Sequence, residues 1–194
     1  MNAGDIWNYD RCRERIAPLR GRLGFPDSPF LEFLRLRLDL ASGILTTDPD
    51  DTPVPGLRPA VYCILVTYSR AAESPECFRQ LAFRDLPGGL AYDASFRTRA
   101  ILPLADLYSR DPPAFARAME SLGGIPVAYA DHAWKLNALP RVPVDILVWD
   151  KSGEFPSSAA MFFDASVPAY LETEAAAMLG ELVTQRIAFF CNGP

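Results

Sequence analysis

Two short apolar segments separated by a polar stretch constrain the fold more than any other part of this sequence. Residues 142–149 read VPVDILVW and residues 159–164 read AAMFFD, and both are rich in residues that favour β-strands. Asp150 and Gly153, in the stretch DKSGEFPSS between them, are residue types that suit a turn. The sequence therefore predicts a hairpin of two antiparallel strands, in which Asp164 ends the second strand and can cap a short helical turn.

Further strands and several helices are predicted around this hairpin. The segment IPVAYADHAWKLNA predicts one or two more strands, and the alternation of leucine with charged residues in FLRLRLDL favours one strand over a helix. The clearest helix signal is Asp111 followed by Pro112, where an apolar periodicity begins that Gly123 and Gly124 close. The other predicted helices lie in residues 9–19, start at Pro59 and Pro103, and follow a cap at Thr173.

Strands and helices do not alternate regularly along the chain. The sequence therefore predicts an α+β fold, with a small, mostly antiparallel sheet backed by about four to five helices, rather than a doubly wound sheet. With 194 residues, the chain is long enough for one domain with a sizeable core, so we expect a single domain over residues 1–194. The segment TTDPDDTPVPGLRP at residues 46–59 is predicted to be an exposed connection, because its prolines break helices and strands.

The charge distribution argues against a polyanionic partner. The formal net charge is −5, and its acidic excess lies in residues 100–194. The one basic run, RCRERIAPLRGR, is interpreted as a solvated helix face, because Asp10 and Glu14 dilute it. Nucleic-acid binding draws on clustered Lys and Arg that displace counterions, so no nucleic acid is expected as a partner.

Compartment is indicated by the apolar runs and the cysteines. The longest apolar runs fall well short of the roughly 20 residues of a membrane-spanning helix, and MNAGDIWNYDRCRER has no signal-peptide core. The four cysteines include no Cys-x-x-Cys pair, which argues against a local iron–sulfur or zinc site. We expect a cytoplasmic protein with reduced thiols that does not bind a membrane. These cysteines are Cys12, Cys63, Cys77 and Cys191.

The chain lacks the motifs of common catalytic and nucleotide-binding sites. Its single histidine, His132, excludes sites that need two or three imidazoles, and no G-x-S-x-G elbow is present. His132 is interpreted as a surface or strand-edge residue, with a ligand or proton-transfer role as the alternative. The pairs Gly88-Gly89 and Gly123-Gly124 match no phosphate-binding loop, and Gly88 is interpreted as a turn residue. No motif implies a cofactor or a metal.

Asp150, Glu154 and Asp164 form the candidate carboxylate cluster, with Asp145 as an additional member. A calcium loop starting at Asp150 is excluded because Phe155 occupies the position that requires glycine. Paired acids for glycoside cleavage or for a divalent metal stay open, and so does a purely structural role in a turn and a cap.

Aromatic residues supply the candidate ligand-binding site. Trp134 and Trp149 bring large apolar area, and if both face one pocket with Phe155 they make a platform for a flat ligand. The alternative is ordinary packing with each indole N–H satisfied at a rim. His132 completes the set of candidate ligand-binding residues.

Several segments resemble a known family. The order of FRDLPGGLAYDASF, a proline-started helix, SLGGIP, LPRVPVDIL and LVWDKSGEFPSSAAMFFDASVPAYLETE resembles the domain-of-unknown-function family 3786 from about residue 30 onward. Members of that family are anaerobe-associated and often described as iron–sulfur cluster proteins. The resemblance implies an accessory role in anaerobic corrinoid or one-carbon metabolism. This chain lacks the cysteine-rich module of some relatives, so the cluster is not carried over to it.

Three functions are open at this point. The first is a cytoplasmic binding or accessory domain for a protein partner or a bulky cofactor. The second is a carboxylate-dependent divalent-metal enzyme, and the third is a purely structural protein-interaction module. The absence of catalytic motifs favours the first over the enzyme.

Overall fold

The predicted hairpin forms the centre of a larger antiparallel sheet. In the computed structural model, which describes residues 7–48, 50–128, 130 and 132–193, strands β7 (Val142–Trp149) and β8 (Ser158–Asp164) pair along their length. Gly153 has a φ of 58°, and Ser152 and Phe155 exchange backbone hydrogen bonds across the tip. The hairpin and the turn at Gly153 are therefore confirmed. The sheet has the order β4-β8-β7-β6-β5, with β4 at Gln80–Ala82, β5 at Ile125–Pro126 and β6 at His132–Leu139.

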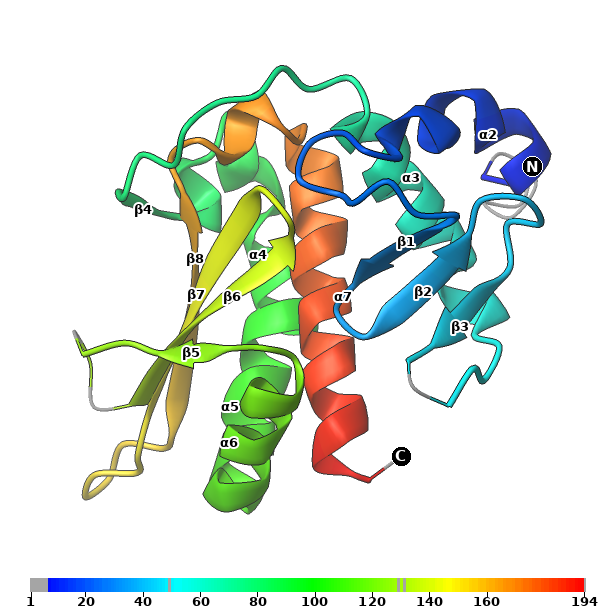
Figure 1. Ribbon diagram of the computed structural model, residues 1–194. Helices are drawn as coiled ribbons and strands as arrows, with labels where there is room; N and C mark the ends of the chain where they lie inside the picture. The colour runs from blue at the N-terminus through cyan, green and yellow to red at the C-terminus, as the bar shows by residue number, and fades with distance from the viewer. Residues whose placement is uncertain (1–6, 49, 129, 131, 194) are drawn as a thin grey trace.

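Helices cover one face of this sheet, as Figure 1 shows. Val144, Ile146 and Val148 of β7 point into the core beneath them and are almost completely buried. The covering elements are α4 (Asp93–Phe96), a π-helical turn (Arg97–Ile101), α5 (Leu102–Arg110), α6 (Pro112–Ser121) and α7 (Thr173–Cys191).

The predicted helix ends are partly confirmed. The Asp111 side chain accepts a hydrogen bond from the Ala114 N–H at 2.8 Å, so it caps α6 as expected. Thr173 is the first residue of α7 rather than its cap, and its hydroxyl donates to the Pro87 carbonyl. Gly180 of α7 has a packing role, because a Cβ there would lie 2.5 Å from the Phe96 ring.

A second, three-stranded antiparallel sheet has the order β1-β2-β3. The strand predicted over FLRLRLDL is confirmed at β2 (Leu36–Asp39), but its predicted start was wrong, because Leu34 and Arg35 form a two-residue turn that joins β2 to β1 (Phe30–Phe33). Both turn residues, Leu34 and Arg35, have positive φ values, of 50° and 56°. Strand β3 (Leu45–Thr47) completes the sheet, and helices α2 (Tyr9–Ile16) and α3 (Arg58–Tyr68) pack together beside it.

Arg186 links α7 to this hairpin. Its guanidinium is 2% exposed and donates hydrogen bonds to the carbonyls of Leu34 at 3.0 Å and Arg35 at 3.1 Å. Burial, together with the nearby Arg35 charge, lowers the pKa of Arg186 to about 10. The two carbonyls and the rings of Phe189 and Phe190 therefore solvate a cation that lies out of water.

The α+β class is confirmed, with the strands divided between two antiparallel sheets instead of one. Within the described residues, no helix is long and apolar enough to cross a membrane. Of the predicted exposed connection at 46–59, Pro49 lies outside the described residues, as do residues 1–6 of the N-terminal segment. Short 3₁₀ turns complete the chain at Ala17–Leu19, Pro55–Leu57, Phe83–Asp85, Gly89–Tyr92 and Val167–Ala169.

Candidate ligand-binding groove

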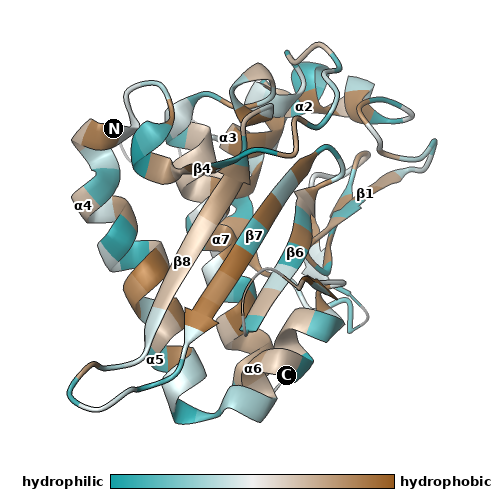
Figure 2. Cartoon of the chain, turned by 90° about the vertical axis from the view of Figure 1, so that its left-hand side faces the viewer, coloured by the Kyte–Doolittle hydropathy of each residue, from teal (hydrophilic) through white to brown (hydrophobic). Residues whose placement is uncertain are grey.

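The face of the five-stranded sheet that points away from the helices carries a groove of about 800 Å³. Figure 2 shows this face, with the apolar strand β7 running through its middle. Alternate side chains of β7 form the groove floor, because successive residues of a strand point to opposite faces. From Pro143 to Trp149 this floor extends for about 20 Å at the usual rise per residue. The floor residues are Pro143, Asp145, Leu147 and Trp149.

One wall of the groove is the extended segment 72–79 between α3 and β4, here called the strap. The Asp164 carboxylate at the end of β8 holds it, accepting hydrogen bonds from the backbone N–H of Cys77 at 2.8 Å and of Arg79 at 3.2 Å. Asp164 also accepts from the Ser166 N–H at 2.9 Å, although the cap position of the next helical turn is Ser166 and not Asp164 as predicted. Partial burial opposes ionisation, but these hydrogen bonds prevail and lower the pKa of Asp164.

The strap presents Phe78 at the rim of the groove. Phe78 is 82% exposed and has a φ of 54°, a backbone conformation that bulky residues rarely adopt. The two N–H groups that Asp164 binds flank this residue, so the carboxylate fixes the strap on both sides of it. The Lys135 ammonium lies 5.4 Å from the Phe78 ring centre and forms an ion pair with Glu76 of the strap.

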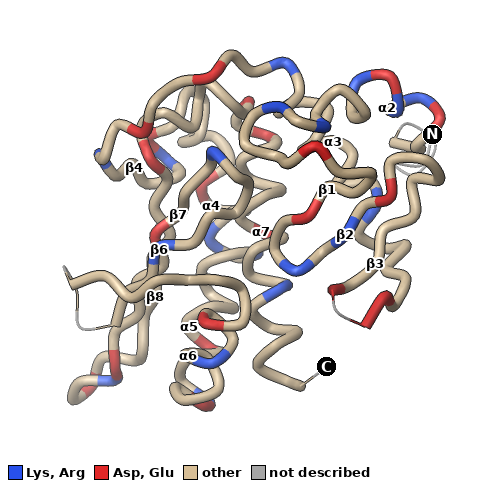
Figure 3. Tube along the Cα trace, in the orientation of Figure 1, with Lys and Arg blue, Asp and Glu red and all other residues tan. Residues whose placement is uncertain are grey.

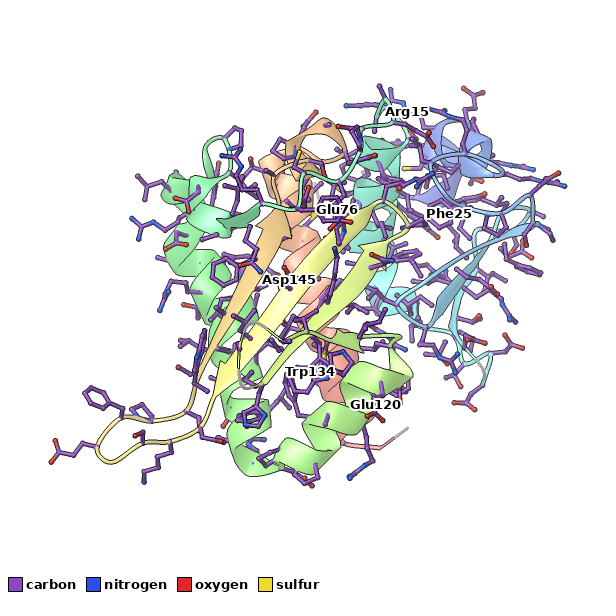
Figure 4. All side chains as sticks on the ribbon, turned by 60° about the vertical axis from the view of Figure 1, so that its left-hand side comes forward. Arg15, Phe25, Glu76, Glu120, Trp134 and Asp145 are labelled. Carbon is purple, nitrogen blue, oxygen red and sulfur yellow. The ribbon has the colours of Figure 1, made fainter. Side chains whose placement is uncertain are left out.

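Asp145 is the polar residue of the groove floor. Its Oδ2 accepts a hydrogen bond from the Gln80 side chain at 2.7 Å. Its Oδ1 is shielded from solvent and contacts no donor within the described residues. Lys135 is the direct cross-strand neighbour of Asp145, but its ammonium is held by Glu76. Figure 4 shows Asp145 and Glu76 on this face of the sheet.

The two candidate tryptophans lie on opposite faces of the sheet. Trp149 is 40% exposed on the groove floor. Trp134 is 7% exposed on the helix-covered face, where its ring centre lies 5.6 Å from that of Phe115. Phe155 is 77% exposed at the tip of the β7–β8 hairpin. The structure therefore does not bring the three predicted aromatic residues together, and Trp149 alone of them lines the groove.

His132 and Asp150 do meet, on the helix side of the sheet. The Asp150 carboxylate lies 3.2 Å from the His132 Nε2 and accepts a hydrogen bond from the Tyr108 hydroxyl at 2.9 Å. Burial first, and then the Asp150 charge, raise the pKa of Tyr108 to about 12. Tyr108 belongs to α5 and carried no sequence signal for this contact.

The carboxylates of the candidate cluster do not converge. Asp150 and Asp164 lie at opposite ends of β8, about 20 Å apart along the strand, and Glu154 is exposed at the hairpin tip. Within the described residues, no group of three or more His, Cys, Asp or Glu side chains is arranged to hold a metal ion. The cysteines, all of them free, therefore do not form an iron–sulfur ligand set in this part of the chain.

The family model for the domain of unknown function DUF3786 matches residues 40–186. The chain belongs to this family. The match covers the whole five-stranded sheet and the groove, whereas α2, β1 and β2 of this DUF3786 member lie outside it. No curated protein and no solved structure matches the chain.

Sequence reasoning found part of the groove of this DUF3786 member. Asp145 and Trp149 were candidates, and the alternation of VPVDILVW is a signal that places them on one face with Leu147. Phe78 and Glu76 were missed, since the strap has neither a helical nor a strand period. Lys135 is recognisable only once the register of β6 against β7 is known.

Proposed function

We propose that this DUF3786 member is a binding or accessory domain that holds a ligand with a flat apolar body in its groove. The proposal rests on the groove in the uncovered face of the sheet. This groove has a volume of about 800 Å³, with Trp149 on its floor and Phe78 at its rim. Pockets of several hundred Å³ with apolar and aromatic walls are typical of small-molecule sites. An exposed indole beside apolar side chains offers a stacking surface for such a ligand.

A narrower version of the proposal follows from the family resemblance. An accessory role in anaerobic corrinoid or one-carbon metabolism would make the ligand a corrinoid or a comparable flat cofactor. His132 lies on the other side of the sheet, so the imidazole would not contact a group in the groove. Stacking on Trp149 and hydrogen bonds to the floor would hold the cofactor instead.

The separation of the carboxylates favours this binding role over a divalent-metal enzyme, because metal ligands must lie within about 2.6 Å of one ion. A protein-interaction module is the alternative, with the exposed Phe155 as its contact. We also propose a reducing compartment such as the cytoplasm, because all four cysteines are free.

Tryptophan fluorescence tests the proposal. The chain is titrated with hydroxocobalamin, haem and planar aromatic dyes, in parallel with the variants Trp149→Phe and Trp7→Phe. We expect saturable quenching in the wild-type chain and in Trp7→Phe, and binding at least about fivefold weaker in Trp149→Phe because the stacking surface is smaller.

Since these ligands absorb light themselves, only the difference between the two variants is interpreted. Titrations without saturation across the whole panel would overturn the small-molecule proposal, and equal quenching in both variants would remove the binding site from the groove.

A further inference from the structure

The charged side chain of the groove floor is negative, and one of its carboxylate oxygens is shielded from solvent. The five charged groups that line the groove are Glu76, Arg79, Lys135, Asp145 and Asp164. The Glu76 and Lys135 charges compensate each other in an ion pair. The Asp164 carboxylate already accepts hydrogen bonds from three backbone N–H groups. Arg79 is exposed, so water screens its charge strongly. Asp145 therefore dominates the electrostatics at the bottom of the groove.

Asp145 also has an unused hydrogen-bonding position. Gln80 occupies Oδ2, while Oδ1 is shielded from solvent and has no donor among the described residues. Its neighbours in the groove are the cross-strand residues Lys135, whose ammonium Glu76 holds, and Phe162, with the apolar Pro143 and Leu147 along β7. A desolvated acceptor without a donor is costly in free energy, and the cost is larger for a charged group. A ligand donor that displaces the side chains covering Oδ1 and binds this oxygen removes that cost.

We infer that the groove takes a ligand with a cationic hydrogen-bond donor, such as a protonated amine, that binds Asp145 Oδ1. This inference rests on the proposed function and names the polar group of its ligand. Asp145 and Trp149 lie four residues apart in β7, which corresponds to about 13 Å. The apolar body of the ligand therefore spans that distance over Leu147 and reaches the Trp149 ring.

Three matched probes test the inference. Phenylhexylamine, phenylhexanol and phenylheptanoate share a phenyl ring and a flexible chain and differ in the charge of the terminal group. Binding to the full chain is followed by the ¹H–¹⁵N resonance of the Trp149 indole N–H, assigned with Trp149→Phe. We expect the amine to bind roughly ten- to hundredfold more tightly than the alcohol, the range of one charge-assisted hydrogen bond.

The variant Asp145→Asn separates charge from shape. It is expected to remove the preference for the amine, so that phenylhexylamine and phenylhexanol bind this variant with similar affinity. Asp150→Asn, on the other side of the sheet, is the matched control and should keep the preference.

Equal affinity for phenylhexylamine and phenylhexanol would overturn the inference. Tighter binding of phenylheptanoate would also overturn it and would indicate that Arg79, not Asp145, selects the charge of the ligand. In both cases the groove would survive as a binding site. If none of the three probes shifted the Trp149 resonance, the proposed function itself would fail. The comparison of probes on the wild-type chain decides these outcomes even if Asp145→Asn does not fold.

Discussion

A single carboxylate, Asp164, determines how the strap lies on the sheet. It binds two N–H groups that are more than 80 residues away in sequence and that flank Phe78. The sequence correctly predicts that Asp164 ends a strand, but the predicted cap was wrong, because Ser166 occupies the cap position of the helical turn that follows. The sequence does not predict that Asp164 binds the strap, because no local pattern marks the strap N–H groups as donors to a distant side chain.

Replacing Asp164 with Asn tests this role. The amide has one acceptor oxygen in place of two, so at least one strap N–H loses its partner, and we expect a loss of about 1–3 kcal/mol in the free energy of unfolding at pH 7. Urea denaturation measures this loss, and faster amide exchange at Cys77 and Arg79 reports it locally.

The pH dependence follows from the lowered pKa of Asp164. A carboxyl whose pKa is lower in the folded chain stabilises it fully above its unfolded pKa of about 3.9, and the stabilisation is lost as the pH falls through the folded value. The stability difference between the wild-type chain and Asp164→Asn should therefore shrink below pH 4. A difference that stays constant down to pH 2 would contradict the assignment.

Among the elements, the β1–β2 hairpin shows most clearly where local patterns are insufficient. The alternation in FLRLRLDL is equally consistent with one strand or with a strand that begins after a two-residue turn, because Phe33 and Leu36 pair directly across such a turn. Turns of this kind usually contain Asn-Gly, whereas this turn has Leu34 and Arg35 at the two central positions. Leu34 and Arg35 adopt positive φ instead, and Arg186 of α7 binds their carbonyls. A tertiary contact thus compensates for unfavourable turn residues.

The variant Arg35→Gly tests the strain in this turn. Glycine adopts positive φ without the steric cost of a side chain, so we expect stabilisation of up to about 1 kcal/mol. The Arg35–Asp48 ion pair is lost, but such a partly exposed pair contributes little. Arg35→Ala is the control, since it loses the same ion pair and keeps the strain. If the melting temperatures of the two variants were equal, the turn would not be strained.

At the scale of the whole molecule, α7 joins the two sheets. It packs on α3, α5 and α6, and its Arg186 binds the β1–β2 turn. Figure 1 shows the helix between the two sheets. In the view of Figure 3, Lys and Arg are interspersed with Asp and Glu around the molecule. The family match at residues 40–186 omits β1, β2 and the end of α7. The fully buried apolar residues of the omitted part are Ile16, Leu19, Leu31, Leu36, Leu38 and Ile187.

A fragment of residues 40–186 is therefore expected not to fold cooperatively. The fragment lacks six fully buried apolar side chains, each of which contributes about 1.5–3 kcal/mol, and their sum is comparable with the whole stability of an ordinary domain. Thermal melting followed by circular dichroism, compared with the full chain, measures this. A sharp transition at the temperature of the full chain would show that the matched region is an autonomous unit.

The sequence predicted the architecture of the molecule better than its binding surface. Each long element has a local period or cap, so the central hairpin and α6 could be identified within one or two residues. The groove combines a strand, a strap and a cross-strand neighbour, and these meet only when the sheet register is fixed. Trp134 and Trp149 look alike in sequence, and only the pairing of Trp134 with Ile146 reveals that they face opposite ways.

The attachment of the strap has a kinetic consequence. Asp164 holds its Cys77–Arg79 end, and the Tyr170 hydroxyl binds the backbone of Ser74, so the groove wall is already in place before a ligand arrives. Entry then requires no closing step, and association should be a single second-order process whose rate rises linearly with ligand concentration. Ligands of different affinity would differ mainly in how long they stay, so residence time is the property by which this domain would distinguish them.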